Sequence, residues 1–119
     1  MFAGVDEPAV LNLKMTQGAC WNKVIILKDN LGVPLDLTGC EAKMQIRPSV
    51  TDSTVLLELS TANGRITIVG TEGKLFLAVG HIYTALLSDD AVYDLDIMIG
   101  TCVYTILRGQ ILLILQVTR

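Results

Sequence analysis

The sequence has few aromatic residues, few charged residues and no concentration of positive charge. Aromatic residues make up 5% and charged residues 18% of the 119 residues, and the formal net charge is -3. Proteins that bind nucleic acid or an anionic membrane usually carry a cluster of lysine and arginine, and none occurs here. Unbroken apolar runs, such as residues 24–27 and 111–115, are far shorter than the roughly 20 residues of a membrane-spanning helix. We therefore expect neither a nucleic-acid partner nor a membrane partner.

Cysteine and histidine are too sparse to encode a zinc site or a disulfide framework. Cys20, Cys40 and Cys102 are widely spaced without a CxxC pair, and His81 is the only histidine. We interpret the cysteines as small buried hydrophobic residues of a reducing compartment. No Gly-x-Ser-x-Gly motif accompanies His81. We expect no catalytic residues, no cofactor and no enzymatic activity.

The densest acidic cluster consists of four aspartates: Asp89, Asp90, Asp94 and Asp96. Carboxylate oxygens are ligands that calcium prefers, so a cation site is one interpretation. However, Asp94 and Asp96 alternate along one expected strand, and no loop of the EF-hand type follows them. We favour a solvated face or salt bridges to Lys43 and Arg47, and the cation site stays open as the alternative.

The apolar content of the chain predicts a folded domain with its own core. Apolar residues make up 51%, and the mean hydropathy is +0.54, which excludes intrinsic disorder. Turn-forming residues recur about every eight to twelve positions between runs of Val, Ile, Leu and Thr, which is typical of an all-β sandwich or barrel. We expect a single domain over residues 1–119, in which residues 1–20 form an extended N-terminal segment.

The turn residues divide the chain into expected elements. Asn63-Gly64 between two β-prone runs is a strong hairpin signal, and Gly100 and Gly109 are expected to separate the last three strands. We expect strands at 21–28, 42–47, 54–60, 65–69, 74–79, 92–99, 101–108 and 110–117, and one helical turn at 82–87.

Two of these strands are apolar on both faces. A two-layer sandwich has one dry interior, so the second face of such a strand needs another cover. We expect a partner chain to supply it and predict four interface residues: Val24, Ile26, Leu112 and Ile114. Leaving four such side chains in water would forgo about 1.5 to 3 kcal/mol each. The alternative is that a long loop or the N-terminal segment 5–15 folds over this face.

Several short motifs together resemble one family. They are Trp21, Ile25-Ile26-Leu27-Lys28-Asp29, Gly32-Val33-Pro34-Leu35-Asp36-Leu37-Thr38-Gly39, Ala42-Lys43-Met44-Gln45-Ile46-Arg47, Asn63-Gly64-Arg65-Ile66-Thr67-Ile68, Tyr93-Asp94-Leu95 and Val117-Thr118-Arg119. The chain is similar to small structural proteins of tailed bacteriophages and prophages, including the Ig-like domains at the amino end of baseplate and tail-fibre attachment proteins. The match covers roughly residues 21–119, and its motifs are turn and packing motifs.

The resemblance implies an Ig-like antiparallel β-sandwich of about eight strands with at most one short helical turn. It also implies a non-enzymatic virion structural protein, either a tail, baseplate or fibre adaptor or a head decoration subunit. Such a protein is made in the host cytoplasm and resides in the virion, and we expect a homo-oligomer that also contacts other phage structural proteins. The alternative function is a carbohydrate-binding module for host attachment, against which the shortage of aromatic residues weighs.

Overall fold

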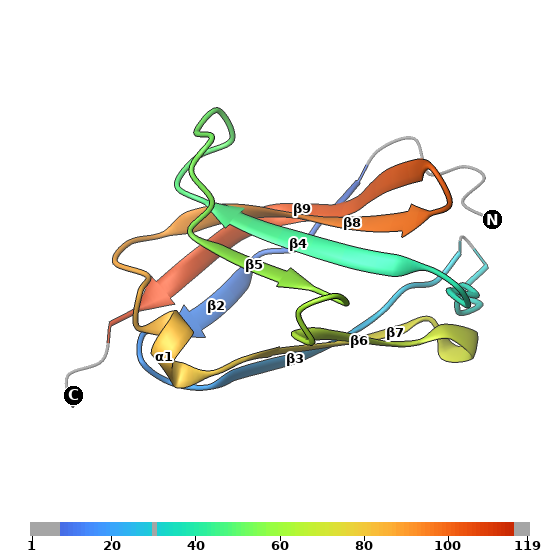
Figure 1. Cartoon of the computed structure of the whole chain (residues 1–119), viewed down its shortest axis with the longest axis horizontal. Coiled ribbons are helices and arrows are strands. Elements are labelled where there is room, and N and C mark those ends of the chain that lie inside the picture. The colour runs from blue at the N-terminus through green and yellow to red at the C-terminus, as the bar shows by residue number, and fades with distance from the viewer. Residues whose placement is uncertain (1–7, 30, 116–119) are drawn as a thin grey trace.

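The computed structural model describes residues 8–29 and 31–115. Within them the chain forms two β-sheets packed face to face, which confirms the predicted all-β sandwich (Figure 1). These residues contain nine strands, one four-residue helix, α1 (His81–Thr84), and one 3-10 turn, η1 (Gly70–Glu72). No helix among them has the length and apolar character needed to cross a membrane.

The two sheets have the strand order of an Ig-like sandwich. Sheet A contains β1 (Ala9–Val10), β2 (Leu13–Thr16), β4 (Glu41–Arg47), β5 (Leu57–Ser60), β8 (Ala91–Ile99) and β9 (Cys102–Ile114). Sheet B contains β3 (Trp21–Ile26), β6 (Ile66–Val69) and β7 (Lys74–Val79). The order is β1-β9-β8-β4-β5 in sheet A, with β2 also against β9, and β3-β7-β6 in sheet B. The β3-β7-β6 sheet therefore faces β9-β8-β4, as strands B, E and D face G, F and C in an Ig domain.

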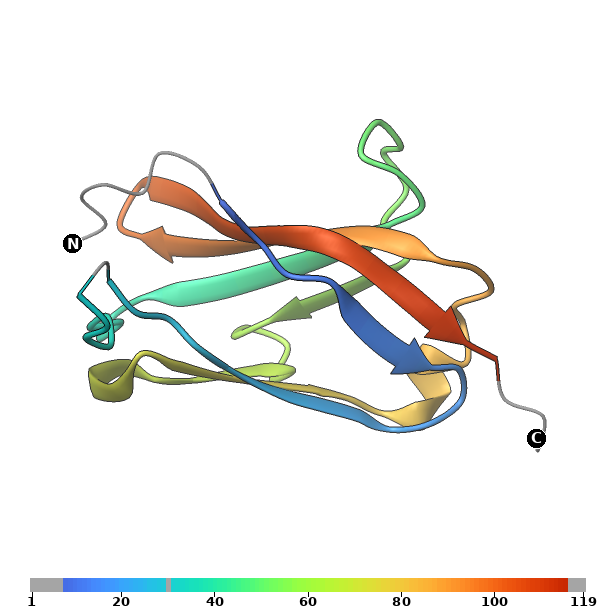
Figure 2. The ribbon, with the colours of Figure 1, turned by 180° about the vertical axis from the view of Figure 1, so that it is seen from behind.

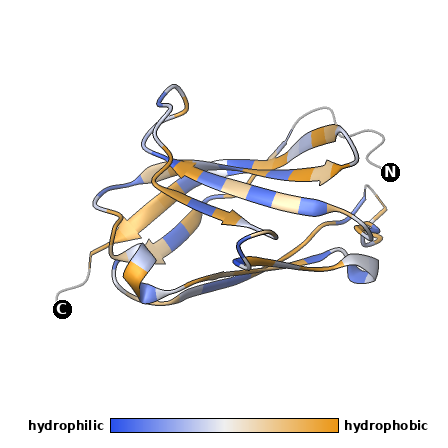
Figure 3. Cartoon of the chain, viewed as in Figure 1, coloured by the Kyte–Doolittle hydropathy of each residue, from blue (hydrophilic) through white to orange (hydrophobic). Residues whose placement is uncertain are grey.

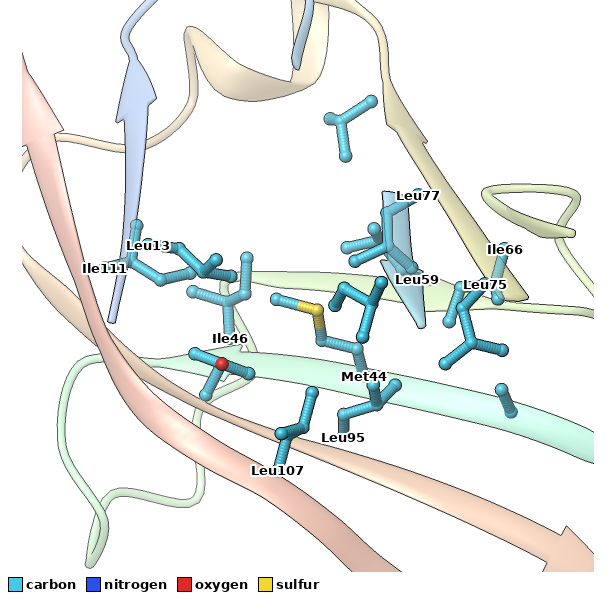
Figure 4. Packing of buried hydrophobic residues seen from close by; sticks show 14 of the residues in the cluster. Leu13, Met44, Ile46, Leu59, Ile66, Leu75, Leu77, Leu95, Leu107 and Ile111 are labelled. Atoms are coloured by element: carbon cyan, nitrogen blue, oxygen red, sulfur yellow. The ribbon is translucent and has the colours of Figure 1, made fainter. Parts of the chain in front are cut away.

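The core between the sheets follows from alternation along the strands. In β4, Ala42, Met44 and Ile46 are completely buried, and polar residues separate them (Figure 3). Inward-facing side chains of both sheets interdigitate in one cluster (Figure 4). Each fully buried aliphatic side chain contributes about 1.5 to 3 kcal/mol. The buried members include Leu13, Leu59, Ile66, Leu75, Leu77, Leu95, Leu107 and Ile111.

The turn at Asn63-Gly64 does not form the expected hairpin. Gly64 has φ 79°, as a tight turn requires, but β5 pairs with β4 while β6 pairs with β7. The chain therefore crosses from sheet A to sheet B at this turn. The Asn63 side chain holds the turn by accepting hydrogen bonds from the backbone N–H groups of Ser60 and Arg65, at 2.9 and 3.0 Å. A turn signal reports a local reversal and not the sheet that the next strand joins.

The expected break at Gly109 is also wrong, because β9 is one strand of 13 residues that runs through it. An extra residue, Ile106, forms a β-bulge where the pairing with β8 shifts register. Gly109 does not form a turn. It allows the backbone of another segment to pack closely against β9. A Cβ placed there would lie 2.2 Å from the carbonyl oxygen of Leu11, which belongs to the connection between β1 and β2.

The N-terminal segment is part of the sandwich. Both β1 and β2 pair with β9 in parallel, whereas every other described pairing of strands is antiparallel. Between them, the Leu11 carbonyl accepts a hydrogen bond from the Tyr93 hydroxyl, and the Asn12 side chain accepts one from the Gln110 N–H at 3.0 Å. Burial, with a smaller effect of the neighbouring Asp94 charge, raises the pKa of Tyr93 to about 12. The hydroxyl is therefore a stable donor at neutral pH.

Candidate functional site

The four predicted interface residues are all exposed. The exposed fraction is 49% for Val24, 45% for Ile26, 48% for Leu112 and 44% for Ile114. They do not form one surface, because Val24 and Ile26 lie on sheet B whereas Leu112 and Ile114 lie on sheet A. Their side chains point to the two opposite outer faces of the sandwich. Exposure fits the prediction, and contact with a partner remains a prediction.

The outer face of sheet B has an apolar centre. Val24 in β3 lies directly opposite Phe76 in β7, which is 40% exposed, and Ile26 lies opposite Lys74. The Lys74 ammonium is 3.9 Å from a carboxylate oxygen of Glu72. Phe76 is absent from the interface predicted from sequence, although its place between two inward-facing leucines marks it as outward. We call Val24, Ile26 and Phe76 the sheet B patch.

The second apolar surface lies at the end of β9. In register, Leu112 pairs with Lys14 and Ile114 pairs with Thr16, while β8 begins opposite Ile111. The end of β9 therefore extends beyond β8 as a ribbon with β2 alone (Figure 2). We call Leu112 and Ile114 the ribbon patch.

The N-terminal segment does not cover the ribbon patch over its described part. Leu13 and Met15 point into the core and are buried, because β2 lies beside β9 in the same sheet. The alternative cover by residues 5–15 is therefore wrong for residues 8–15, and residues 5–7 lie outside the described residues.

The free edge of β5 is closed by side chains. The Glu58 carbonyl accepts hydrogen bonds from the side chains of Asn63 and Arg65, both at 2.9 Å. The Ser60 N–H donates to Asn63 at 2.9 Å. Since the Ala42–Thr61 pair carries a ladder hydrogen bond, Glu58 and Ser60 direct their backbone groups away from β4. Another strand would have to displace these side chains to pair with this edge.

The edges on the other side of the sandwich are protected as well. Lys23 in β3 lies opposite the inward-facing Leu77, so a charged residue occupies an inward position of an edge strand. Such inward charges are a known device against pairing between sheet edges. On β2, the Lys14 carbonyl accepts a hydrogen bond from the Trp21 indole at 2.9 Å, which ties β2 to β3. These edges therefore favour contact through the faces of the sheets.

The four aspartates of the acidic cluster do not act together, and three of them accept separate local hydrogen bonds. Asp90 accepts a hydrogen bond from the Leu113 N–H at 2.8 Å, and Asp96 accepts one from the Thr105 hydroxyl at 2.7 Å. Asp89 accepts one from the Asp90 N–H at 2.7 Å, and Asp94 is exposed. In the described part of the chain, no three His, Cys, Asp or Glu residues gather in a way that could hold a metal ion.

The predicted salt bridges from this cluster to Lys43 and Arg47 are wrong. Between residues 8–29 and 31–115, the ion pair that forms is the one between Lys74 and Glu72. The Arg47 guanidinium instead donates to the Gln45 side chain at 2.6 Å. A partly solvated position gives a long side chain several partners, so register alone does not select the carboxylate.

The outer face of sheet A carries a shallow groove of about 950 Å³. Its floor is a grid of charges set by strand register, in which Lys43 lies opposite Asp96 and Asp94 lies opposite Arg108. The loop between β4 and β5, which includes Val50, rises beside the groove (Figure 1). Apart from the buried Tyr93, the lining contains no aromatic residue among the described residues.

Hydrogen bonds hold the base of this loop. Arg47 donates to the Asp52 carbonyl at 3.1 Å, and the Asp52 carboxylate accepts from the Thr54 N–H at 2.8 Å. The backbone hydrogen bond from Thr54 contributes most to lowering the pKa of Asp52 below its usual value. The loop is therefore a positioned wall of the groove.

The cysteines and the histidine lie apart from these surfaces. Cys20 and Cys102 are exposed, so the expectation of three buried cysteines is wrong for two of them. Cys40 is half-buried, and burial raises the pKa of its thiol, with a smaller effect of the Asp36 charge. His81 is exposed and begins α1.

Comparison with known proteins does not add to this description. Neither a scan against protein-family models nor a search of curated proteins finds a match for the chain. A function for the chain therefore has to be inferred from the surfaces of the molecule.

Proposed function

We propose that this protein is a non-enzymatic assembly subunit of a tailed-phage virion, acting as a tail, baseplate or fibre adaptor or as a head decoration protein. The phage assignment rests on the sequence resemblance. The assembly role is supported by the exposed apolar side chains on the outer faces of both sheets. It does not depend on any cluster of reactive side chains.

The observation that carries the proposal is the contrast between faces and edges. Three edges of the sheets are protected by Lys23, by the Trp21 indole and by the side chains of Asn63 and Arg65. The sheet B patch and the ribbon patch remain open. Burying an apolar surface contributes about 25 cal/mol per Å². We therefore place the contacts with other virion proteins on these two patches and not on strand edges.

The test is incorporation of patch variants into particles. Phe76→Asp and Ile114→Asp should fold, because both side chains are exposed, but they should fail to enter the virion since the introduced carboxylate loses its hydration in the contact. Leu31→Asp is the matched control, because Leu31 is 88% exposed in a loop outside both patches. Circular dichroism checks folding, and mass spectrometry of purified particles counts the subunits. Normal incorporation of both patch variants would refute the proposal.

A carbohydrate-binding module is the second candidate, and the groove on sheet A is the observation in its favour. Asn12, Gln45 and Gln110 line it together with charged side chains that could bind hydroxyl groups. Sugar-binding sites usually add an exposed aromatic ring, and the one aromatic residue of this lining, Tyr93, is buried. Binding to a glycan array would favour this candidate over assembly.

A further inference from the structure

The groove on sheet A carries charges of both signs that make no ion pair with each other among the described residues. Lys43 and Asp96 are direct neighbours across β4 and β8, and Asp94 and Arg108 are direct neighbours across β8 and β9. Neither pair forms an ion pair in the part of the chain that the structure describes. On the β5 side, Glu58 lies opposite Gln45 and accepts its hydrogen bond at 2.9 Å. The face therefore has a fixed pattern of both signs.

We propose that this face docks a second copy of the same chain. The two copies of sheet A pack face to face about a two-fold axis that runs along the strands, between β4 and β8. This rotation keeps the position along the strands, so it sets β4 against β8 of the second copy and β5 against its β9. The inference rests on the proposed assembly function and names a first partner for it. The surface is separate from the sheet B patch and adjoins the ribbon patch on the outer face of sheet A.

This axis brings opposite charges together at two positions and a hydrogen-bonding pair together at a third. Lys43 faces Asp96 of the partner subunit, and Glu58 faces Arg108 of the partner subunit. Gln45 faces Asp94 of the partner subunit and can donate a hydrogen bond to it. The two-fold symmetry repeats each contact, so the dimer gains six complementary contacts from side chains that are already in register.

Neighbouring axes give the opposite result. An axis along β8 would place Asp94 against Asp94 and Asp96 against Asp96. An axis along β4 would place Lys43 against Lys43 and Glu58 against Asp94. Like charges in contact disfavour association, so the charge pattern disfavours both of these axes.

The loop between β4 and β5 agrees with this arrangement. It rises from sheet A at the end of β4, and Val50 within it is 78% exposed (Figure 1). The axis preserves direction along the strands. The loop of each copy therefore lies near the end of the partner subunit at which β9 carries the ribbon patch. Val50 of the loop and Leu112 of β9 are among the exposed apolar side chains at these two ends. The dimer therefore shields apolar surface at its margin as well as charges at its centre.

The dimensions of the face indicate a weak dimer. Seven residues of β4 span about 24 Å, and four strands span about 19 Å. This footprint lies at the small end of specific interfaces, and its contacts are polar. We expect a dissociation constant in the micromolar range that depends strongly on ionic strength. In a particle, several such contacts made at once would offset the weakness of each one.

A charge-exchange experiment tests the arrangement. Lys43→Glu places two acids in contact, and Asp96→Lys places two bases in contact, so each variant alone should dimerise at least tenfold more weakly than the unmodified chain. An equimolar mixture should form a heterodimer with near-original affinity, because the acid introduced at position 43 then faces the base introduced at position 96. Lys74→Glu, on sheet B, is the control and should dimerise normally. Analytical ultracentrifugation at about 100 μM and native mass spectrometry measure these states.

The mixing step separates contact between copies from effects within one chain. Each variant is the same molecule before and after mixing, so recovery of the dimer cannot come from improved folding. Failure of the mixture to recover, or a monomeric unmodified chain at low salt, would overturn the inference. It would leave the proposed function untouched, since that function is decided by incorporation of Phe76→Asp and Ile114→Asp into particles.

Discussion

Replacing Tyr93 with phenylalanine tests how the N-terminal strands are held on the sandwich. The Tyr93 side chain is 3% exposed, and its hydroxyl donates a hydrogen bond to the Leu11 carbonyl between β1 and β2. The substitution keeps the ring and removes the donor. The Leu11 carbonyl then lacks this partner next to Gly109, where the backbones are already in close contact.

The expected loss of stability is about 1 to 2 kcal/mol at pH 7, the usual effect of removing one partner of a buried hydrogen bond. For a domain of this size, this corresponds to a fall in Tm of about 5 °C. The Tyr83→Phe variant is the control, because Tyr83 is exposed and its ring keeps the stacking contact with the Arg65 guanidinium. The control should change stability by less than about 0.5 kcal/mol.

The pH dependence provides a second, independent readout. The pKa of Tyr93 is about 12 in the folded chain, against an ordinary value of 10. The stabilisation is therefore complete below pH 10 and is lost as pH rises through 12. The loss approaches about 2 to 3 kcal/mol, since each pKa unit corresponds to 1.36 kcal/mol. The Tyr93→Phe variant lacks this loss, so the advantage of the unmodified chain should vanish between pH 10 and pH 12.

Urea unfolding followed by far-ultraviolet circular dichroism at several pH values measures both effects. Other titrating groups are common to the two proteins and cancel in the difference. Equal stability at pH 7, or parallel pH profiles of the two proteins, would show that the Tyr93 hydroxyl does not hold the N-terminal strands.

Four further outcomes are expected. Gly109→Ala should destabilise the fold more than Gly100→Ala in urea unfolding, although Gly100 has a positive φ, because only the first places a Cβ against backbone. Leu113→Asp should lower Tm by several degrees more than Ile114→Asp, since Leu113 packs against the core and Ile114 is exposed. Lys23→Val should increase aggregation measured by light scattering, because it removes the inward charge of an edge strand. A chelator together with a thiol reductant should leave Tm unchanged within about 1 °C, and a fall of several degrees would revive the cation site.

The sequence predicted those features that depend on period and local turns. The strand expected at residues 42–47 matches β4, and the chain does turn at Asn63-Gly64, although not into a hairpin. These features arise from a few adjacent residues. The exposure of the four predicted interface residues could be predicted from alternation as well. A strand has two faces, and only one of them packs against the core.

Features that depend on residues distant in sequence could not be predicted. Gly109 looked like a turn because the residue that approaches it, Leu11, belongs to another part of the chain. The position of Val24 and Leu112 on opposite sheets follows from topology, which neither strand encodes by itself. The charge grid of the groove likewise appears only once the registers of β4, β8 and β9 are known.

The pairing of β2 with β9 has a consequence for how the chain folds during translation. Asn12 meets Gln110, 98 positions later. At about 5 to 20 residues per second, a ribosome needs roughly 5 to 20 s to cover that distance. During this interval β9 has not been synthesised, so β2 has no strand to pair with. The core side chains of Leu13 and Met15 therefore stay exposed in the nascent chain. Chaperones that bind emerging apolar segments could therefore bind the N-terminal strands of this sandwich before β9 pairs with them.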